Sequence, residues 1–481
     1  MRHALSALLL LCVALPSLAQ GADASALLIN EVQVANIDQY LDNAYCYGSW
    51  IEFYNPSDED ISMGGLYLVD GENETRFLSS TNVVPAGGFK TLWFDHSRTQ
   101  GNYGVNSGQQ VPYKLNAEGG EIVLRTKDGT VIASAQYPPS IPRCSWARTT
   151  DGGEEWGWTG DPTPGASNQG SRFAMFRLEA PAVDVDSRLF TESFTARVDI
   201  PSGYTLRYTT DGSAPTRTHG ETSADGRFDI ARTTILRLCY VQDDYLPSPV
   251  VTRSYIYRNH DYYLPVLSVV SAPDNFFSNT IGVFVKGTNG TSGNGQNTAC
   301  NWNMDWERPV NMEYLVPETN ADGGTDYRAV LNQEMDLEIS GGWTRAYGSG
   351  WVDNRYWEAR SSFRLKTDRR YEGVHEISYP VFPLKPHNKY RCWQVRNGGN
   401  DTYARTKDPA IQQMVLRSGF YVDCQDYQPA HVFLNGEYFG MLNIRESNNK
   451  HFAYSNYGID FEDMDQFDLS NAQYNQKMGD N

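Results

Sequence analysis

AHVFLNGEYFGMLNIRE, residues 430–446, is the stretch that decides how the C-terminal part of this chain folds. Asn435 and Gly436 predict a two-residue turn, because a type I′ hairpin needs positive φ at both of its central positions. The flanking runs VFL and EYF are rich in residues that favour strands. The stretch therefore predicts a β-hairpin, which ends in the charged pair Arg445-Glu446.

A helix is expected just before this hairpin. Asp408 is a favourable N-cap residue, and Pro409 suits the first helical position. Gly419 is suited to the C-cap. We interpret Asp408 as a capping residue in preference to an ion-pair partner for a lysine. The helix should present an apolar face with i, i+3, i+4 spacing, made of Ile411, Met414 and Val415.

Length and composition bound the architecture. A chain of 481 residues is too long for one hydrophobic core and indicates about three domains. The abundance of Gly (42) and Pro (23) favours strands and turns over long helices. A net charge of −18 without a basic patch argues against nucleic acid as a partner and fits an exported, soluble protein.

The N-terminus is typical of an export signal. Met1-Arg2-His3 precedes the apolar run 4–15, which is too short to span a bilayer. Ser17 and Ala19 put small residues at the −3 and −1 positions, so residues 1–19 are expected to be a signal peptide cleaved after Ala19. No later run is apolar for long enough to be a transmembrane segment. The mature protein is therefore expected to be secreted or held at the cell surface.

Six cysteines follow the expected cleavage site, and an oxidising compartment permits disulfides between them. They are widely spaced and include no CxxC, which argues against a metal cluster. About fifteen pairings are open to six cysteines, and unpaired buried thiols fit the sequence equally well. The six are Cys46, Cys144, Cys239, Cys300, Cys392 and Cys424.

Residues 22–168 have the pattern of an all-β domain, in which short β-rich runs alternate with turn clusters. Glu31 and Glu52 are interpreted as structural residues rather than metal ligands, because strands often carry single charges. Five ordered pieces resemble a lamin-tail domain: LINEV (28–32), WIEFYNPSDEDISMGGLYLVD (50–70), VPAGG (84–88), GGEIVLRTKDGTVI (119–132) and DPTPGASN (161–168). The resemblance implies an immunoglobulin-like sandwich that binds or spaces and performs no chemistry.

Residues 169–181 are predicted to be a linker, and residues 182–258 a second, smaller β module. Its signature, YTLRYTTDGSAPT (204–216), contains the turn Asp211-Gly212. With the β-rich run 233–257, it resembles the small C-terminal β-sandwich of bacterial chitobiases and hexosaminidases. That module is an accessory in its family, and no acidic pair here has a glycosidase context.

The third region, residues 262–481, contains seven ordered pieces of one pattern: LPVLSVV, NWNMDWERPVNMEYL (301–315), ISGGWTRAYGSG (339–350), SSFRLK (361–366), PVFPL (380–384), RNGGNDTYARTKD (396–408) and the opening hairpin. Together they resemble the CotH family, the atypical secreted kinases first recognised in spore coats. The resemblance implies an α+β kinase-like N-lobe, binding of ATP and magnesium, and transfer of phosphate to Ser or Thr of secreted or surface proteins. The expected fold class is therefore multidomain and mainly β, with two immunoglobulin-like β-sandwich modules followed by this lobe.

Five residues in these pieces are expected to bind the nucleotide: Gly341, Gly342, Arg360, Lys366 and Glu446. The glycine pair would let the backbone approach phosphate closely. Arg360 and Lys366 would supply cations, and Glu446 matches the hinge-like position of the family. Taken singly, the glycines also fit an ordinary strand-to-turn pair and the lysine a solvated edge strand.

Two functions are open on the sequence. The first is an exported CotH-like ATP-dependent protein kinase. Its catalytic and metal motifs should follow the hinge, and residues 447–481 contain neither, so we expect an incomplete domain without catalytic or metal residues. The second is a non-catalytic adhesion or scaffold protein of the cell surface, whose β modules bind a polymer or glycan.

Overall fold

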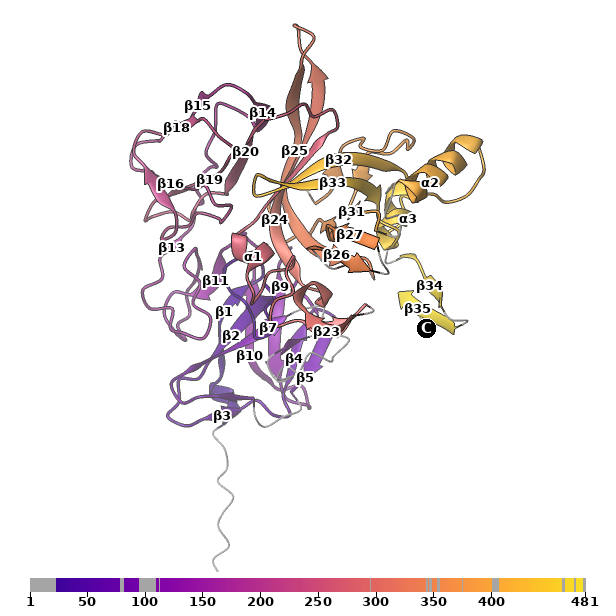
Figure 1. Ribbon diagram of the computed structural model, residues 1–481. Helices are drawn as coiled ribbons and strands as arrows, with labels where there is room; N and C mark the ends of the chain where they lie inside the picture. The colour runs from indigo at the N-terminus through magenta and orange to yellow at the C-terminus, as the bar shows by residue number, and fades with distance from the viewer. Residues whose placement is uncertain are drawn as a thin grey trace, which may run out of the picture.

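The computed structural model shows a mainly β protein with three units along the chain (Figure 1). It describes residues 23–77, 82–94, 110–111, 113–294, 296–342, 345, 348–352, 355–373, 375–399, 406–460, 463–470 and 473–478. The expected signal peptide, residues 1–19, and its cleavage site at Ala19 lie outside the described residues. Within them, no helix combines the length and the apolar character needed to cross a bilayer.

The first unit is a sandwich of two sheets, with strand orders β13-β12-β11-β1-β2-β7-β8 and β10-β9-β4-β5. Apolar side chains from both sheets form one core between them. Its 3-10 turn and strands are η1 (Ala24–Ala26), β1 (Leu28–Gln33), β2 (Ser49–Tyr54), β3 (Ile61–Ser62), β4 (Tyr67–Asp70), β5 (Asn73–Arg76), β6 (Val83–Val84), β7 (Phe89–Phe94), β8 (Gln110–Val111), β9 (Gly120–Arg125), β10 (Val131–Tyr137), β11 (Ser145–Arg148), β12 (Trp156–Thr159) and β13 (Phe173–Ala174).

The segment predicted to be a linker, residues 169–181, is partly built into the fold. Strand β13 lies inside it and pairs with β12, so it extends the first sheet. Arg177 then forms a parallel bridge with Leu246 of the second unit. The connection between the two units is therefore fixed by backbone pairing at both of its ends.

The second unit packs a five-stranded sheet, β14-β20-β19-β16-β17, against the two-stranded sheet β15-β18. The predicted turn at Asp211-Gly212 follows β16, and Gly212 adopts a positive φ of 95°. The strands are β14 (Arg188–Phe190), β15 (Phe194–Arg197), β16 (Thr205–Thr209), β17 (Glu221–Ser223), β18 (Arg227–Ile230), β19 (Thr234–Val241) and β20 (Val251–Tyr257).

The third unit is built on a closed barrel with the order β21-β24-β25-β28-β31-β33-β32. The long strands β24 and β25 run through the middle of the molecule, with the second unit on one side and helices α2 and α3 on the other (Figure 1). The barrel closes through parallel pairing of β21 with β32. The predicted hairpin and the strand that carries Lys366 both belong to this barrel, but no sequence pattern indicated its closure.

The interior of the barrel is filled by apolar side chains, among them Leu337, Phe363, Leu365 and Trp393. Its elements, and the short ones around it, are β21 (Val266–Val270), α1 (Pro273–Phe277), β22 (Thr291–Gly293), β23 (Gln296–Cys300), η4 (Asn301–Asn303), β24 (Glu307–Thr319), β25 (Thr325–Ser340), β26 (Gly348–Val352), β27 (Arg355–Ala359), β28 (Ser362–Lys366), β29 (Ile377–Ser378), β30 (Lys389–Tyr390), β31 (Cys392–Arg396), α2 (Lys407–Ser418), β32 (Tyr427–Leu434), β33 (Glu437–Glu446), α3 (Lys450–Tyr457), β34 (Gln466–Ser470) and β35 (Gln473–Met478).

The opening hairpin is confirmed as β32 and β33. Asn435 has φ 47° and Gly436 has φ 81°, as a type I′ turn requires. The side-chain amide of Asn435 accepts from Ser271 N and donates to Ser271 O, both at 2.9 Å, which ties the turn to the end of β21. Gly436 packs against Thr233 of the second unit. The turn therefore also joins two units.

Helix α2 starts differently from the prediction. It begins at Lys407, so the N-cap position belongs to Thr406 and Asp408 lies in the first turn. Asp408 instead pairs with Arg445 of the hairpin strand β33. Gly419 is the C-cap, with φ 76°, as predicted. The expected apolar face is largely exposed, with Met414 71% accessible, so packing of that face does not position the helix.

A buried ionic junction holds the three units together. Glu334 of the barrel accepts from Arg143 of the first unit at 2.6 Å and from Arg237 of the second at 3.4 Å. Arg143 also pairs with Asp38 at 2.8 Å. Because the Arg237 side chain is only 4% exposed, this junction is largely shielded from solvent.

The six cysteines that follow residue 19 are all free thiols. Of the two alternatives left open by the sequence, the structure shows unpaired cysteines and not disulfides. Five are buried, and Cys424 is half-buried. Burial raises the pKa of the Cys144 and Cys239 thiols to about 12, which leaves these two thiols protonated and unreactive at neutral pH.

Candidate functional site

Lys366 is the centre of the candidate site. It ends β28 and points away from the barrel interior, because its neighbour Leu365 fills the core. Its ammonium donates to Glu338 Oε2 of β25 at 2.7 Å and to Glu307 of β24. Burial opposes the charge, but the two carboxylates outweigh it and hold the pKa of Lys366 well above its usual range. Lys366 is thus a half-buried, permanently charged cation.

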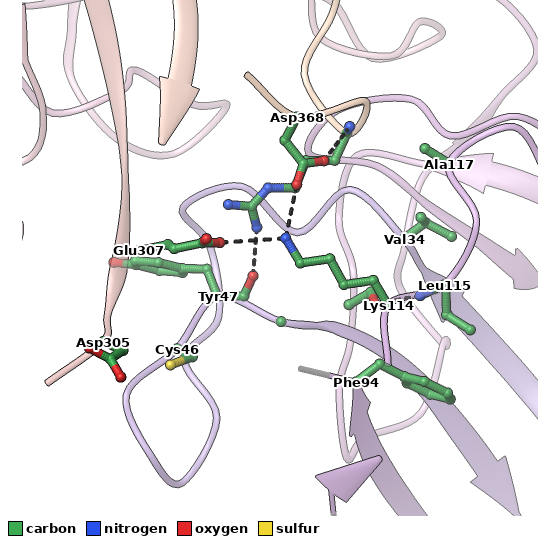
Figure 2. Close-up of a pocket in the computed structure, with 13 residues that line it drawn as sticks. Val34, Cys46, Tyr47, Phe94, Lys114, Leu115, Ala117, Asp305, Glu307 and Asp368 are labelled. Atoms are coloured by element: carbon green, nitrogen blue, oxygen red, sulfur yellow. Dashed lines mark hydrogen bonds and ion pairs between the residues drawn. The ribbon is translucent and has the colours of Figure 1, made fainter. Parts of the chain in front are cut away.

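A second lysine, from the first unit, reaches Glu307, one of these two carboxylates (Figure 2). Lys114 Nζ lies 2.9 Å from Asp368 and 3.4 Å from Glu307, across a small cavity of about 50 Å³ between the units. A cavity of this size has room for about one or two water molecules. Arg370 borders it and donates to Tyr47 O at 2.8 Å. The cavity wall therefore combines cations and carboxylates with apolar side chains, among them Val34, Phe94 and Leu115.

A row of cations continues from Lys366 across the outer face of the barrel. Arg364, Gln394 and Arg445 stand opposite one another on β28, β31 and β33, so their side chains share one face. Arg396, one step along β31, lies on the same face. The Nε atoms of Arg364 and Arg445 are buried without an acceptor among the described residues. Buried N–H groups normally find an acceptor, so these two N–H groups could still donate hydrogen bonds to a ligand.

The structure does not bring the five predicted nucleotide residues together. Gly341 and Gly342 follow β25, whose last residue Ser340 pairs with the first residue of β28. Lys366 is at the other end of β28, about 13 Å away along the strand. Arg360 precedes β28 and lies at the glycine end, where its Nε donates to Phe439 O at 2.6 Å.

Glu446 lies on the opposite face from Lys366. It pairs with Trp393, whose side chain belongs to the barrel core, and it is 1% exposed. Burial opposes ionisation of this carboxyl, but His387 and Lys385 hold its pKa below the usual range. Its backbone carbonyl already accepts from Gln425 Nε2 at 2.6 Å. The carboxylate and the backbone carbonyl of Glu446, the expected hinge residue, are therefore both engaged in contacts within the protein.

The partners of Lys366 were missed in the sequence. Glu307 and Glu338 stand on strands that precede β28, and a carboxylate on the outer face of each was the only available signal. Lys114 gave no signal, because it lies 193 residues before Glu307. Within the described ranges, no three His, Cys, Asp or Glu side chains are placed to hold a metal ion.

Comparison with known families agrees with the architecture of the first unit. The fold defines a mainly β, multi-unit protein that starts with an immunoglobulin-like sandwich. Residues 20–139 match the family model described as Lamin Tail Domain, which confirms the predicted module for that range. No curated protein matches the chain.

Proposed function

We propose that this chain provides the nucleotide-binding part of an exported CotH-like ATP-dependent protein kinase acting on Ser or Thr of secreted or surface proteins. One observation carries the proposal: Arg364, Lys366, Arg396 and Arg445 share one outer face of β28, β31 and β33. Two of their buried Nε donors lack an acceptor among the described residues. The oxygens of a triphosphate would satisfy such donors.

The charge of the whole chain sharpens this argument. The net charge of the chain is −18, so most of the protein surface should repel the negatively charged ATP. A face with four cations is the exception, because the carboxylates that adjoin it, Glu307, Glu338 and Asp408, balance only part of its charge. Guanidinium groups bind phosphate oxygens in a forked geometry, and lysine binds them as a point charge. The face would thus attract and orient the phosphates.

Magnesium does not fit the described residues as a resident ion. Glu307, Glu338 and Asp368 are the nearest carboxylates, and each already neutralises a lysine. Hard cations prefer uncommitted carboxylate oxygens. The ion would therefore arrive with ATP, bound to its phosphates, and the role proposed for these residues is binding and positioning of the phosphate chain.

Calorimetric titration with Mg-ATP tests the proposal. Lys366→Ala and Arg364→Ala should each weaken binding about tenfold or more, because each removes a charged contact to phosphate. Lys389→Ala removes an exposed lysine of β30, whose side chain is 64% accessible, and should leave affinity unchanged. An equal affinity of wild type and Lys366→Ala would remove Lys366 from the site, and no binding by the wild type would reject the proposal.

A non-catalytic scaffold of the cell surface is the second candidate. A polar groove of about 620 Å³ between the first and second units favours it. Tyr40, Asp161, Ser213 and His219 line the groove, and His219 Nε2 lies 2.8 Å from Ser213 Oγ. Hydroxyl, imidazole and carboxylate groups beside an aromatic ring suit a neutral sugar. Titration with a panel of neutral oligosaccharides should then show binding that His219→Ala weakens, whereas Mg-ATP should not bind.

A further inference from the structure

The first unit contributes a charged residue to the candidate nucleotide site. Lys114 follows β8 in the first unit, but its ammonium lies between Asp368 and Glu307 of the third unit (Figure 2). Burial opposes the charge of Lys114, and these two carboxylates outweigh it and raise its pKa. Lys114 is therefore a cation of one unit that is committed to carboxylates of another.

Glu307 is shared between the two lysines. Its Oε2 faces Lys114 at 3.4 Å, and its Oε1 accepts from Lys366. Burial opposes its ionisation, but Lys114, Lys366 and Arg370 hold the pKa of Glu307 well below its usual range. The carboxylate is thus fully charged, and its attraction for Lys366 depends on how much of that charge Lys114 offsets.

We propose that Lys114 is a positioning residue for Lys366 and acts through Glu307. By binding Oε2, it weakens the hold of Glu307 on Lys366 and leaves the Lys366 ammonium available to phosphate. Without Lys114, Glu307 would pair with Lys366 alone and compete with the nucleotide. The lamin-tail unit would then tune the affinity of the site. This inference rests on the proposed function.

Docking of the first unit on the third does not depend on the ion pairs of Lys114. The loop before β2 is held against the third unit by Trp306 Nε1, which donates to Ala44 O at 3.0 Å, and by Arg308, which donates to Tyr45 O at 2.9 Å. Arg370 holds Tyr47 in the same way. A substitution of Lys114 should therefore leave the two units docked.

The first test needs no nucleotide. Acetylation of Lys366 in the full chain, followed by mass spectrometry, reports how readily its amine loses a proton. Lys114→Met should slow this acetylation about fivefold, because Glu307 then holds the proton more tightly. Lys114→Arg should restore the wild-type rate, and Lys127→Met, in an exposed turn of the same unit, should not change it. An unchanged rate in Lys114→Met would overturn the inference.

The second test is calorimetry with Mg-ATP. Lys114→Met should bind about fivefold more weakly than wild type, with Lys114→Arg close to wild type. If Lys366→Ala loses binding while Lys114→Met keeps wild-type affinity, this inference fails and the proposed function stands. If the wild type does not bind Mg-ATP, the proposed function fails and the inference falls with it.

Discussion

Two buried carboxyl groups face each other in the first unit, where strands β1 and β2 pair Glu31 with Glu52. Neither is accessible to solvent. Glu31 accepts from Thr163 Oγ1 at 2.9 Å and Glu52 from Gly165 N at 2.6 Å, so both hold the segment that closes the sandwich. Burial and, for Glu52, the charge of Glu31 raise the pKa values to about 7 and about 9, respectively.

Glu52→Gln should change how stability depends on pH. The folded state raises the pKa of Glu52 from 4.5 to about 9 and therefore favours the protonated form. Its contribution is fully present below pH 4.5 and is lost as the pH rises through about 9. Glutamine cannot ionise, so the variant should match wild type in acid and exceed it by about 1–3 kcal/mol at pH 9.

Urea unfolding at several pH values measures this difference. Glu121→Gln, on the exposed edge of β9, is the matched control and should follow the wild-type curve. Parallel curves for wild type and Glu52→Gln would show that folding does not shift the pKa of Glu52, contrary to its burial.

At the scale of helices and strands, sequence signals predicted the structure correctly where the backbone geometry depends only on the residues of the element itself. Asn435-Gly436 predicted the hairpin, because positive φ is a property of the two turn residues alone. The predicted start of α2 was wrong by two residues, because a tertiary contact to Arg445 uses the carboxylate of Asp408 that a cap would need. The candidate site was harder to predict, since Glu307 and Lys114 meet Lys366 only through the packing of distant segments.

The hairpin turn should not tolerate a side chain at Gly436. A Cβ there would lie 2.7 Å from Thr233 Cγ2, and the residue keeps a φ of 81° that alanine disfavours. Gly436→Ala should therefore destabilise the protein by about 1–3 kcal/mol in urea unfolding.

Gly342→Ala provides the comparison for this substitution. A Cβ at Gly342 meets no atom of the described residues within 4 Å, so its effect should stay within about 0.5 kcal/mol. Equal stabilities of Gly436→Ala and wild type would contradict the close packing of the turn on the second unit.

For the molecule as a whole, Glu334 should decide whether the three units unfold together. Glu334→Gln removes the negative charge that Arg143 and Arg237 share, and leaves Arg237 buried without its ionic partner. We expect a loss of about 3 kcal/mol. Because the contact belongs to all three units, calorimetric unfolding should also split from one transition into several.

The control uses an exposed ion pair between β24 and β25, the strand that also carries Glu334. Arg328 and Glu318 pair at 2.6 Å with side chains 60% and 47% exposed, so Glu318→Gln should cost less than about 1 kcal/mol. A single, unshifted transition in Glu334→Gln would mean that apolar packing alone couples the units.

Closure of the barrel has a consequence for folding of the chain during its synthesis. Val266 of β21 is paired with His431 of β32, and most of the third unit lies between these two strands in the sequence. Until β32 has been made, β21 presents a free edge of unpaired backbone groups, the kind of edge on which chains aggregate. Contacts between such distant segments form slowly. The newly synthesised third unit therefore needs protection from aggregation, by a chaperone or by delayed folding, until β21 can pair with β32.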